Sequence, residues 1–136
     1  MDPITIDVPA LNLIPRQRAV ETSILLHNIE YDSIVKRIIS DAVQMKATDI
    51  RFEPMKGNLS IRIRLNGKFY ELCRPPLEYS RRLISRMKVM ADLDIAEERR
   101  PQHGRIRVRS GDRFIDLRLT TLPGEYGEEA RLTVEL

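Results

Sequence analysis

Strict alternation of apolar and polar residues in one short segment, LSIRIRL at positions 59–65, constrains the fold more than any other feature of the sequence. Successive side chains of a β-strand point to opposite faces, so the apolar residues share one face and Ser60, Arg62 and Arg64 share the other. Asn66 and Gly67 follow at once, and this pair favours the two positive-φ positions of a tight hairpin turn. The next segment, KFYELC, is therefore predicted to fold back as a second strand, and the apolar face consists of Leu59, Ile61, Ile63 and Leu65.

Further segments show the same alternation. TDIRFEP is predicted to form a short strand that ends at Pro54. RIRVRSGDRFIDLRL is predicted to form a second hairpin, because the apolar residues of its two halves come into phase across a turn at Ser110, Gly111 and Asp112. ARLTVEL is predicted to form the last strand. The apolar residues that the second hairpin and the last strand bury are Ile106, Val108, Ile115, Leu117, Leu119, Leu132, Val134 and Leu136.

Two segments carry apolar residues at three- and four-residue spacings, which predicts amphipathic helices. The first begins near Tyr31, where Asp32 or Ser33 is placed to cap the first turn. The second follows the sequence RPP and ends between Ala91 and Asp94, and its outward residues are Arg81, Arg82, Ser85 and Lys88. The predicted buried residues are Ile34, Val35, Ile38, Ile39, Ala42 and Met45 in the first helix, and Leu83, Ile84, Met87, Met90 and Ala91 in the second.

The predicted order of elements is an N-terminal arm, a helix, three strands, a second helix and three more strands. Hairpins separated by helices indicate an α+β fold: an antiparallel sheet of about six strands with two helices packed on one face, the two-layer sandwich plan of PAS-like domains. Residues 1–28 contain three prolines and no sustained period, so we interpret them as an N-terminal arm or linker with a short strand at Ile4 to Val8. Residues 29–136 have the length of one domain with one core.

The composition favours a soluble protein of the cytoplasm. Apolar residues make up 42% of the chain and charged residues 32%, and no apolar run approaches the roughly 18 residues that cross a bilayer. The N-terminus, MDPITIDVPA, lacks the basic start and the apolar stretch of a secretory signal. Cys73 is the single cysteine, which excludes an internal disulfide and indicates a reducing compartment.

The polar side of the predicted sheet is rich in arginine. If the apolar strand residues face the helices, the opposite face carries Asp116, Glu135 and a larger set of arginines. These are Arg62, Arg64, Arg105, Arg107, Arg109, Arg118 and Arg131. One interpretation is a solvated surface on which long arginine stems cover the sheet and pair with carboxylates. The other is a phosphate site, because clustered guanidinium groups repel one another less when an anion binds among them, and arginine matches phosphate with paired N–H donors.

Other chemistry has little support in the sequence. The two histidines lie far apart, and with the single cysteine they match no spacing typical of zinc sites. The Walker A pattern G-x-x-x-x-G-K-[ST] does not occur, nor does a hydrolase motif. Glu97 and Glu98, beside Arg99 and Arg100, are interpreted as a solvated charge cluster. The chain alone is therefore not predicted to be an enzyme, and neither a cofactor nor a metal is expected in it.

Four segments taken together resemble a known family. They are ATDIRFEP (Ala47 to Pro54), IRIRLNG (Ile61 to Gly67), SRMKVMADLDIAEERRPQHGRI (Ser85 to Ile106) and DLRLTTLPGEYGEEARL (Asp116 to Leu132). In order and spacing they are similar to the second N-terminal domain of the assembly ATPases of type II secretion and type IV pili. The likeness runs from about Ile34 to the C-terminus. The sequence departs from the family at Arg51, where the family has histidine, and at His103, where it has aspartate.

The resemblance implies a non-catalytic module of a hexameric, ATP-hydrolysing motor. In that family the domain packs against a RecA-like ATPase domain of the same or a neighbouring subunit, where ATP and Mg²⁺ are bound, and arginines of the domain reach the nucleotide phosphates. By motif position, the residues expected to contact phosphate in trans are Arg118 and Arg105, followed by Arg64 and Arg62. The resemblance also implies a cytoplasmic location, or a peripheral one at the inner membrane through the platform proteins of the secretion or pilus machine.

Other functions stay open at this stage. The chain is either a domain excised from a longer motor or a stand-alone adaptor or regulator that occupies the interface of such a motor. A nucleic-acid binding module would use the basic face, but a net charge of only +3 and an aromatic content of 5% argue against nucleic acid as a partner. A small-ligand sensor would share the PAS-like plan and would need a pocket.

Overall fold

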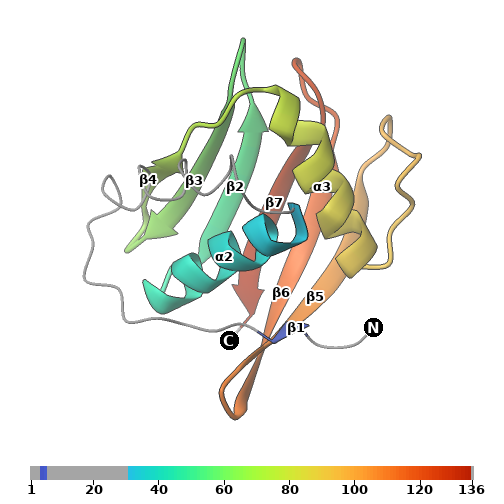
Figure 1. Ribbon diagram of the computed structural model, residues 1–136. Coiled ribbons are helices and arrows are strands. Elements are labelled where there is room, and N and C mark those ends of the chain that lie inside the picture. Colours follow the sequence, from blue (N-terminus) through green and yellow to red (C-terminus); the bar gives the residue numbers. More distant parts are fainter. Residues whose placement is uncertain (1–3, 6–30, 136) are drawn as a thin grey trace.

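Two helices lie on one face of a single sheet in the computed structural model of the protein, which describes residues 4–5 and 31–135 (Figure 1). The elements of the described chain are β1 (Ile4–Thr5), α2 (Tyr31–Gln44), β2 (Asp49–Pro54), β3 (Leu59–Leu65), β4 (Lys68–Cys73), α3 (Glu78–Met90), β5 (Gln102–Ser110), β6 (Arg113–Leu122) and β7 (Glu129–Glu135). This order confirms the predicted succession of helices and strands. Within the described ranges, no helix combines the length and the hydropathy that crossing a bilayer requires.

The sheet has the strand order β1-β5-β6-β7-β2-β3-β4. Its six longer strands are antiparallel to their neighbours, whereas β1 adds in parallel beside Val108 and Arg109 of β5. The predicted α+β sandwich is therefore confirmed, with one short parallel strand added at an edge. β1 falls within the strand predicted at Ile4 to Val8. The rest of the predicted arm, residues 1–3 and 6–28, lies outside the described residues.

Both predicted hairpins close with two-residue turns. Asn66 has φ of 51° and Gly67 has φ of 81°, so the pair occupies the two left-handed positions that a tight turn between β3 and β4 requires. Between β5 and β6, Gly111 has φ of 62° and Ser110 pairs with Arg113. The alternation of β3, β4, β5 and β6 is therefore set by turns that the local sequence encodes.

The core lies between the sheet and the helices, where the alternation predicts it. One apolar row crosses β3, β2, β7 and β6 through the register partners Ile63, Ile50, Leu132 and Leu119, all fully buried. The helices cover this row with Ile34, Val35, Ile38, Ile39 and Ala42 of α2 and with Leu83, Ile84, Met87 and Met90 of α3. Four predicted core residues are only partly buried, namely Met45, Leu65, Ile115 and Val134. The predicted core position of Leu136 lies outside the described residues.

Lys88 contradicts the prediction of an outward side chain on the second helix. It is 1% exposed, and its Nζ donates hydrogen bonds of 2.7 Å to the carbonyl oxygen of Glu97 and to the carboxylate of Glu128. A buried ammonium is tolerated where hydrogen bonds and an opposite charge replace its water. Lys88 therefore ties α3 to the loop before β5 and to the turn before β7.

Asp32 and Ser33 lie inside the first turn of α2, which already includes Tyr31, so neither is the cap that the sequence predicts. Asp32 instead pairs with Lys36 at 2.8 Å and with Arg86 of α3 at 2.9 Å. The hydrogen bond from Lys36 is the main reason that the pKa of Asp32 lies below its ordinary value; burial opposes it and Arg86 adds to it. This carboxylate therefore helps to join the two helices.

Candidate anion-binding site

The register of the sheet brings arginines from distant parts of the sequence onto one face. Residues paired directly across antiparallel strands lie on the same face. The partners Arg64, Asp49, Thr133, Arg118 and Arg105 therefore form one row across β3, β2, β7, β6 and β5. Three of the four predicted phosphate contacts share this row, on the face opposite the helices.

A second row runs beside the first and contains the fourth predicted residue. Arg62 pairs with Arg51, and Arg51 pairs with Arg131. The row continues through Thr120 to His103, whose Nδ1 lies 3.2 Å from the hydroxyl of Thr120. We call the polar side of the sheet the arginine face. Its arginines are Arg51, Arg62, Arg64, Arg105, Arg107, Arg109, Arg118 and Arg131.

The predicted contacts fall into two groups along the first row. Arg105 and Arg118 are direct partners on neighbouring strands, whereas Arg64 lies three strands away from Arg118. Neighbouring strands lie about 4.8 Å apart, so the backbones of Arg64 and Arg118 are separated by roughly 14 Å. These two side chains meet at a common anion only if both extend toward each other across the face.

Arg105 and Arg118 converge on one carboxylate. Arg105 lies 3.3 Å and Arg118 lies 3.4 Å from the two oxygens of Glu135. Both arginine side chains are 63% exposed, so water screens these contacts strongly. Glu135 is therefore the shared carboxylate neighbour of these two arginines.

A different arrangement surrounds Phe69 of β4. The guanidinium carbons of Arg51, Arg62 and Arg64 lie 4.4, 5.4 and 5.5 Å from the centre of its ring. Arg62 also donates from Nη2 to both oxygens of Glu53, at 3.1 and 3.2 Å. We call these three arginines and the phenyl ring the Phe69 cluster. Cation–π attraction to one ring holds like charges together at this end of the face.

Carboxylates are more numerous on the arginine face than the sequence analysis predicts. It expects Asp116 and Glu135 alone within the strands, but the register also places Asp49, Glu53, Glu71 and Glu129 there. Asp49 and Glu53 belong to TDIRFEP and Glu71 to KFYELC, whereas Glu129 lies one residue before the predicted strand ARLTVEL and is the first residue of β7. Part of the face is therefore neutralised by pairing, as the solvated-surface interpretation expects.

The pair formed by Arg107 and Asp116 shows how an ion pair on this face changes the pKa values of its two members. The Nε atom of Arg107 lies 2.9 Å from a carboxylate oxygen of Asp116. This hydrogen bond is the main cause that lowers the pKa of Asp116 and raises the pKa of Arg107. Arg109 donates to the carbonyl oxygen of Gly111 at 3.1 Å, and Arg131 lies 3.7 Å from Glu129. These arginines have partners within the chain.

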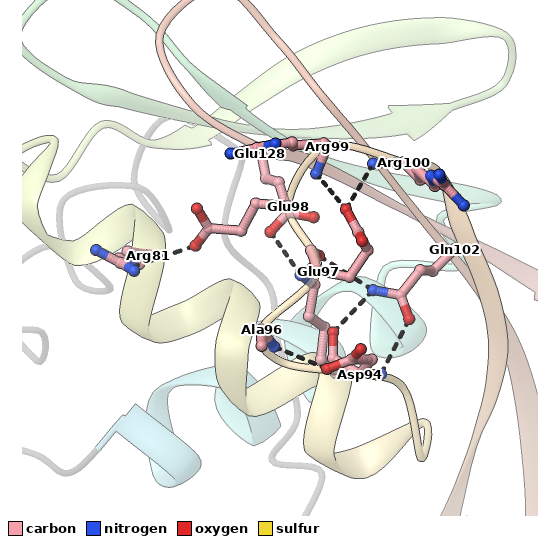
Figure 2. A network of polar contacts seen from close by, with 10 residues as sticks. Arg81, Asp94, Ala96, Glu97, Glu98, Arg99, Arg100, Gln102 and Glu128 are labelled. Carbon is pink, nitrogen blue, oxygen red and sulfur yellow. Dashed lines mark hydrogen bonds and ion pairs between the residues drawn. The ribbon is translucent and has the colours of Figure 1, made fainter.

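The loop before β5 is anchored by the side chain of Gln102 (Figure 2). The amide of Gln102 accepts from the backbone N–H of Asp94 at 2.9 Å and donates to the carbonyl oxygens of Asp94 and Glu97 at 2.8 and 3.2 Å. Two residues later, a Cβ on Gly104 would lie 2.9 Å from both Cβ and the carbonyl oxygen of Ala91. The chain can therefore pass so close to the end of α3 only with glycine at this position.

Glu97 orders the same loop from within (Figure 2). Its carboxylate accepts from the backbone N–H groups of Arg99 and Arg100 at 2.7 and 3.2 Å, while its carbonyl accepts from Lys88. Glu98 pairs with Arg81 of α3 at 3.3 Å. The predicted solvated cluster is thus correct for the exposed members and wrong for Glu97, which is half-buried and holds the backbone.

Cys73 is buried, and burial raises the pKa of its thiol. Among residues 4–5 and 31–135, no cluster of histidine, cysteine, aspartate and glutamate could hold a metal ion.

A family model and several known proteins similar to this chain all belong to secretion or pilus assembly systems. The family model described as Type II/IV secretion system protein matches residues 27–134. The Type II secretion system protein E of Dickeya dadantii is 44% identical over 99 residues, which are 73% of this chain and 20% of that protein. The Type II secretion system ATPase E of Vibrio cholerae is 43% identical over 95 residues, or 70% and 19% of the two chains.

A relative from a pilus system matches in the same way. The Type IV pilus assembly ATPase PilB of Myxococcus xanthus is 39% identical over 97 residues, which are 71% of this chain and 17% of that protein. The chain thus spans about a fifth of the length of the curated relatives it matches.

Proposed function

Because the chain belongs to the Type II/IV secretion system protein family, we propose that it works as a non-catalytic module of a secretion or pilus assembly motor. It packs against a RecA-like ATPase domain of the same or a neighbouring subunit and supplies arginines to ATP bound there with Mg²⁺. The names of the matched relatives, secretion and pilus assembly ATPases, support this proposal. The module acts on the cytoplasmic side, held at the inner membrane by the platform proteins of the machine.

The observation that carries the proposal is the convergence of Arg105 and Arg118 on the arginine face. They are register partners on β5 and β6, and both are exposed. A guanidinium keeps its charge at all physiological pH values and presents paired N–H donors to phosphate oxygens. Such donors stabilise charge on a transferring phosphoryl group without a proton transfer of their own. The pair therefore serves as an in-trans phosphate clamp.

Arg62 and Arg64 have a lesser part in the proposed clamp. Arg62 is held by two contacts with Glu53, and Arg64 lies roughly 14 Å from Arg118 along the sheet. We expect Arg105 and Arg118 to meet the phosphoryl group that is transferred. Arg64 contacts a more distant part of the bound nucleotide.

ATP hydrolysis by a chimera tests the proposal. The chimera joins this chain to the remaining part of a curated relative, so that the ATPase half comes from the relative. Replacing Arg105 and Arg118 together by glutamine is expected to lower kcat by at least about 100-fold, because loss of an arginine that reaches the transferring phosphate removes much of its charge stabilisation.

The matched control is Arg100→Gln, which removes the same charge from an exposed loop position off the sheet. Its kcat should stay within about twofold of the parent chimera, since loop charges contribute little at a distance. Unchanged turnover in the Arg105 and Arg118 double variant, with normal assembly, would refute the clamp.

A further inference from the structure

Two of the three arginines of the Phe69 cluster have no carboxylate partner among the described residues. Among the described residues, Arg51 and Arg64 form no ion pair, whereas Arg62, Arg105, Arg107, Arg118 and Arg131 each have a carboxylate within 4.0 Å. The unpaired guanidinium groups lie 4.4 and 5.5 Å from the centre of the same ring. Two guanidinium groups without an ion pair are therefore held beside one ring at this end of the sheet.

The carboxylates closest in register to Arg51 and Arg64 have other contacts. Glu53 accepts both contacts of Arg62. Glu71 binds Arg74 at 2.6 Å. Asp49 faces Arg64 across the strands but accepts hydrogen bonds from the hydroxyls of Thr48 and Thr133. Among the described residues, Asp49 is thus the one of these three carboxylates without an ion pair, and it forms none with Arg51 or Arg64.

The side chain of Arg51 is held against the ring of Phe69. Its backbone lies on β2 and Phe69 lies on β4, so its side chain crosses β3 between Arg62 and Arg64 to reach the ring. A guanidinium stacked on an aromatic ring keeps its N–H edge free to form paired hydrogen bonds in its own plane. The ring therefore positions the donors of Arg51 before an anion arrives, which lowers the entropy lost on binding.

We infer that Arg51 and Arg64, seated on Phe69, form a second phosphate-binding site of the arginine face. Its ligand is a phosphate group other than the one that Arg105 and Arg118 contact. The inference rests on the proposed function for the nature of the ligand. It adds Arg51 of β2 to the residues that bind phosphate.

Titration of the 136-residue chain with inorganic pyrophosphate tests the inference. Nitrogen–proton spectra follow the Nε–Hε groups of the arginines, and the shifts give the affinity at each site. Arg51→Gln and Arg64→Gln are each expected to weaken binding by about fivefold or more, since each removes a charge-assisted pair of hydrogen bonds. Phe69→Leu keeps an apolar side chain but removes the ring, and it should weaken binding about threefold.

Controls separate a site from general attraction. Arg100→Gln removes the same charge from the exposed loop and should change the affinity by less than about twofold. Citrate carries similar charge on carboxylates, and it should bind more weakly than pyrophosphate. Urea titration of each variant verifies that the fold is retained.

The inference is overturned if Arg51→Gln and Phe69→Leu bind pyrophosphate as the parent chain does, or if citrate binds equally well. If Arg51→Gln and Phe69→Leu have no effect, pyrophosphate can still shift the Nε–Hε signals of Arg105 and Arg118. That result would overturn the second site and leave the proposed clamp standing. Failure of the clamp itself is read from turnover by the chimera, so the two outcomes are distinguishable.

Discussion

Replacing Lys88 by methionine should destabilise the protein strongly. The side chain is 1% exposed, and its partner Glu128 is 9% exposed. Methionine fills most of the volume of lysine but leaves the carboxylate of Glu128 buried without its cation. Breaking a buried pair from one side costs about 3–5 kcal/mol. A domain of this size is stable by about 5–15 kcal/mol, so the variant is expected to lose a large fraction of its stability.

Urea unfolding measures this loss of stability. Substitutions of the partner, Glu128, then show how much of the loss comes from the unpaired carboxylate. Glu128→Gln keeps an acceptor for Lys88 and should cost less, about 1–3 kcal/mol. The double variant Lys88→Met with Glu128→Leu removes both charges, so it should be more stable than Lys88→Met alone by at least about 1 kcal/mol.

Lys36→Met provides the matched control. Lys36 pairs with Asp32 on the surface of α2 and is 38% exposed, so its loss should cost no more than about 0.5 kcal/mol. If Lys88→Met were as stable as Lys36→Met, the burial of Lys88 and its role in joining α3 to the flanking loops would be refuted.

Three other substitutions test separate parts of the structure. Gly104→Ala places a Cβ 2.9 Å from Ala91 and should lower the free energy of unfolding by about 1–3 kcal/mol; a loss below about 0.5 kcal/mol would mean that the close approach does not exist. Glu135→Gln frees Arg105 and Arg118 from their shared carboxylate and should raise the affinity of the chain for pyrophosphate about threefold, whereas Glu129→Gln, at the other end of the same strand, should not; equal effects would contradict a local action of Glu135. Asp32→Asn tests the lowered pKa of Asp32: because the folded pKa lies below the ordinary value of 3.8, the carboxylate adds stability above that pH and loses it as the pH falls through the folded pKa. The stability difference between the parent and Asp32→Asn should therefore shrink on acidification below about pH 5, and a difference independent of pH would disprove the assignment.

Local patterns predicted the elements because each is encoded within a few residues. The Asn66–Gly67 turn sets the phase of β3 and β4, and this phase alone puts Arg62 and Arg64 on the side opposite Ile61 and Ile63. Local patterns do not predict which strands become neighbours in the sheet. That β7 lies beside β2, which joins Arg118 and Arg64 in one row, depends on pairing between segments far apart in the chain.

Two contacts could not be predicted from the sequence, because their members lie far apart in the chain. Lys88 looks like a polar position of a helix, and its carboxylate partner is 40 residues away. Arg51 lies in a segment whose alternation already places it with Asp49 and Glu53, so its face was predictable. Its contact with Phe69 was not, because the two lie on strands separated by β3.

Complementation between two inactive chimeras tests the central claim, that this face meets a phosphate held by another subunit. One chimera carries the Arg105→Gln and Arg118→Gln substitutions, and the other carries an inactivating substitution in the phosphate-binding loop of its ATPase half. In mixed assemblies, an intact ATPase domain of the first meets intact arginines of the second at roughly a quarter of the interfaces. The account predicts that ATP hydrolysis returns to about that fraction of the parent rate when the two are mixed. A mixture that stays as inactive as its separate components, while assembling normally, would contradict it.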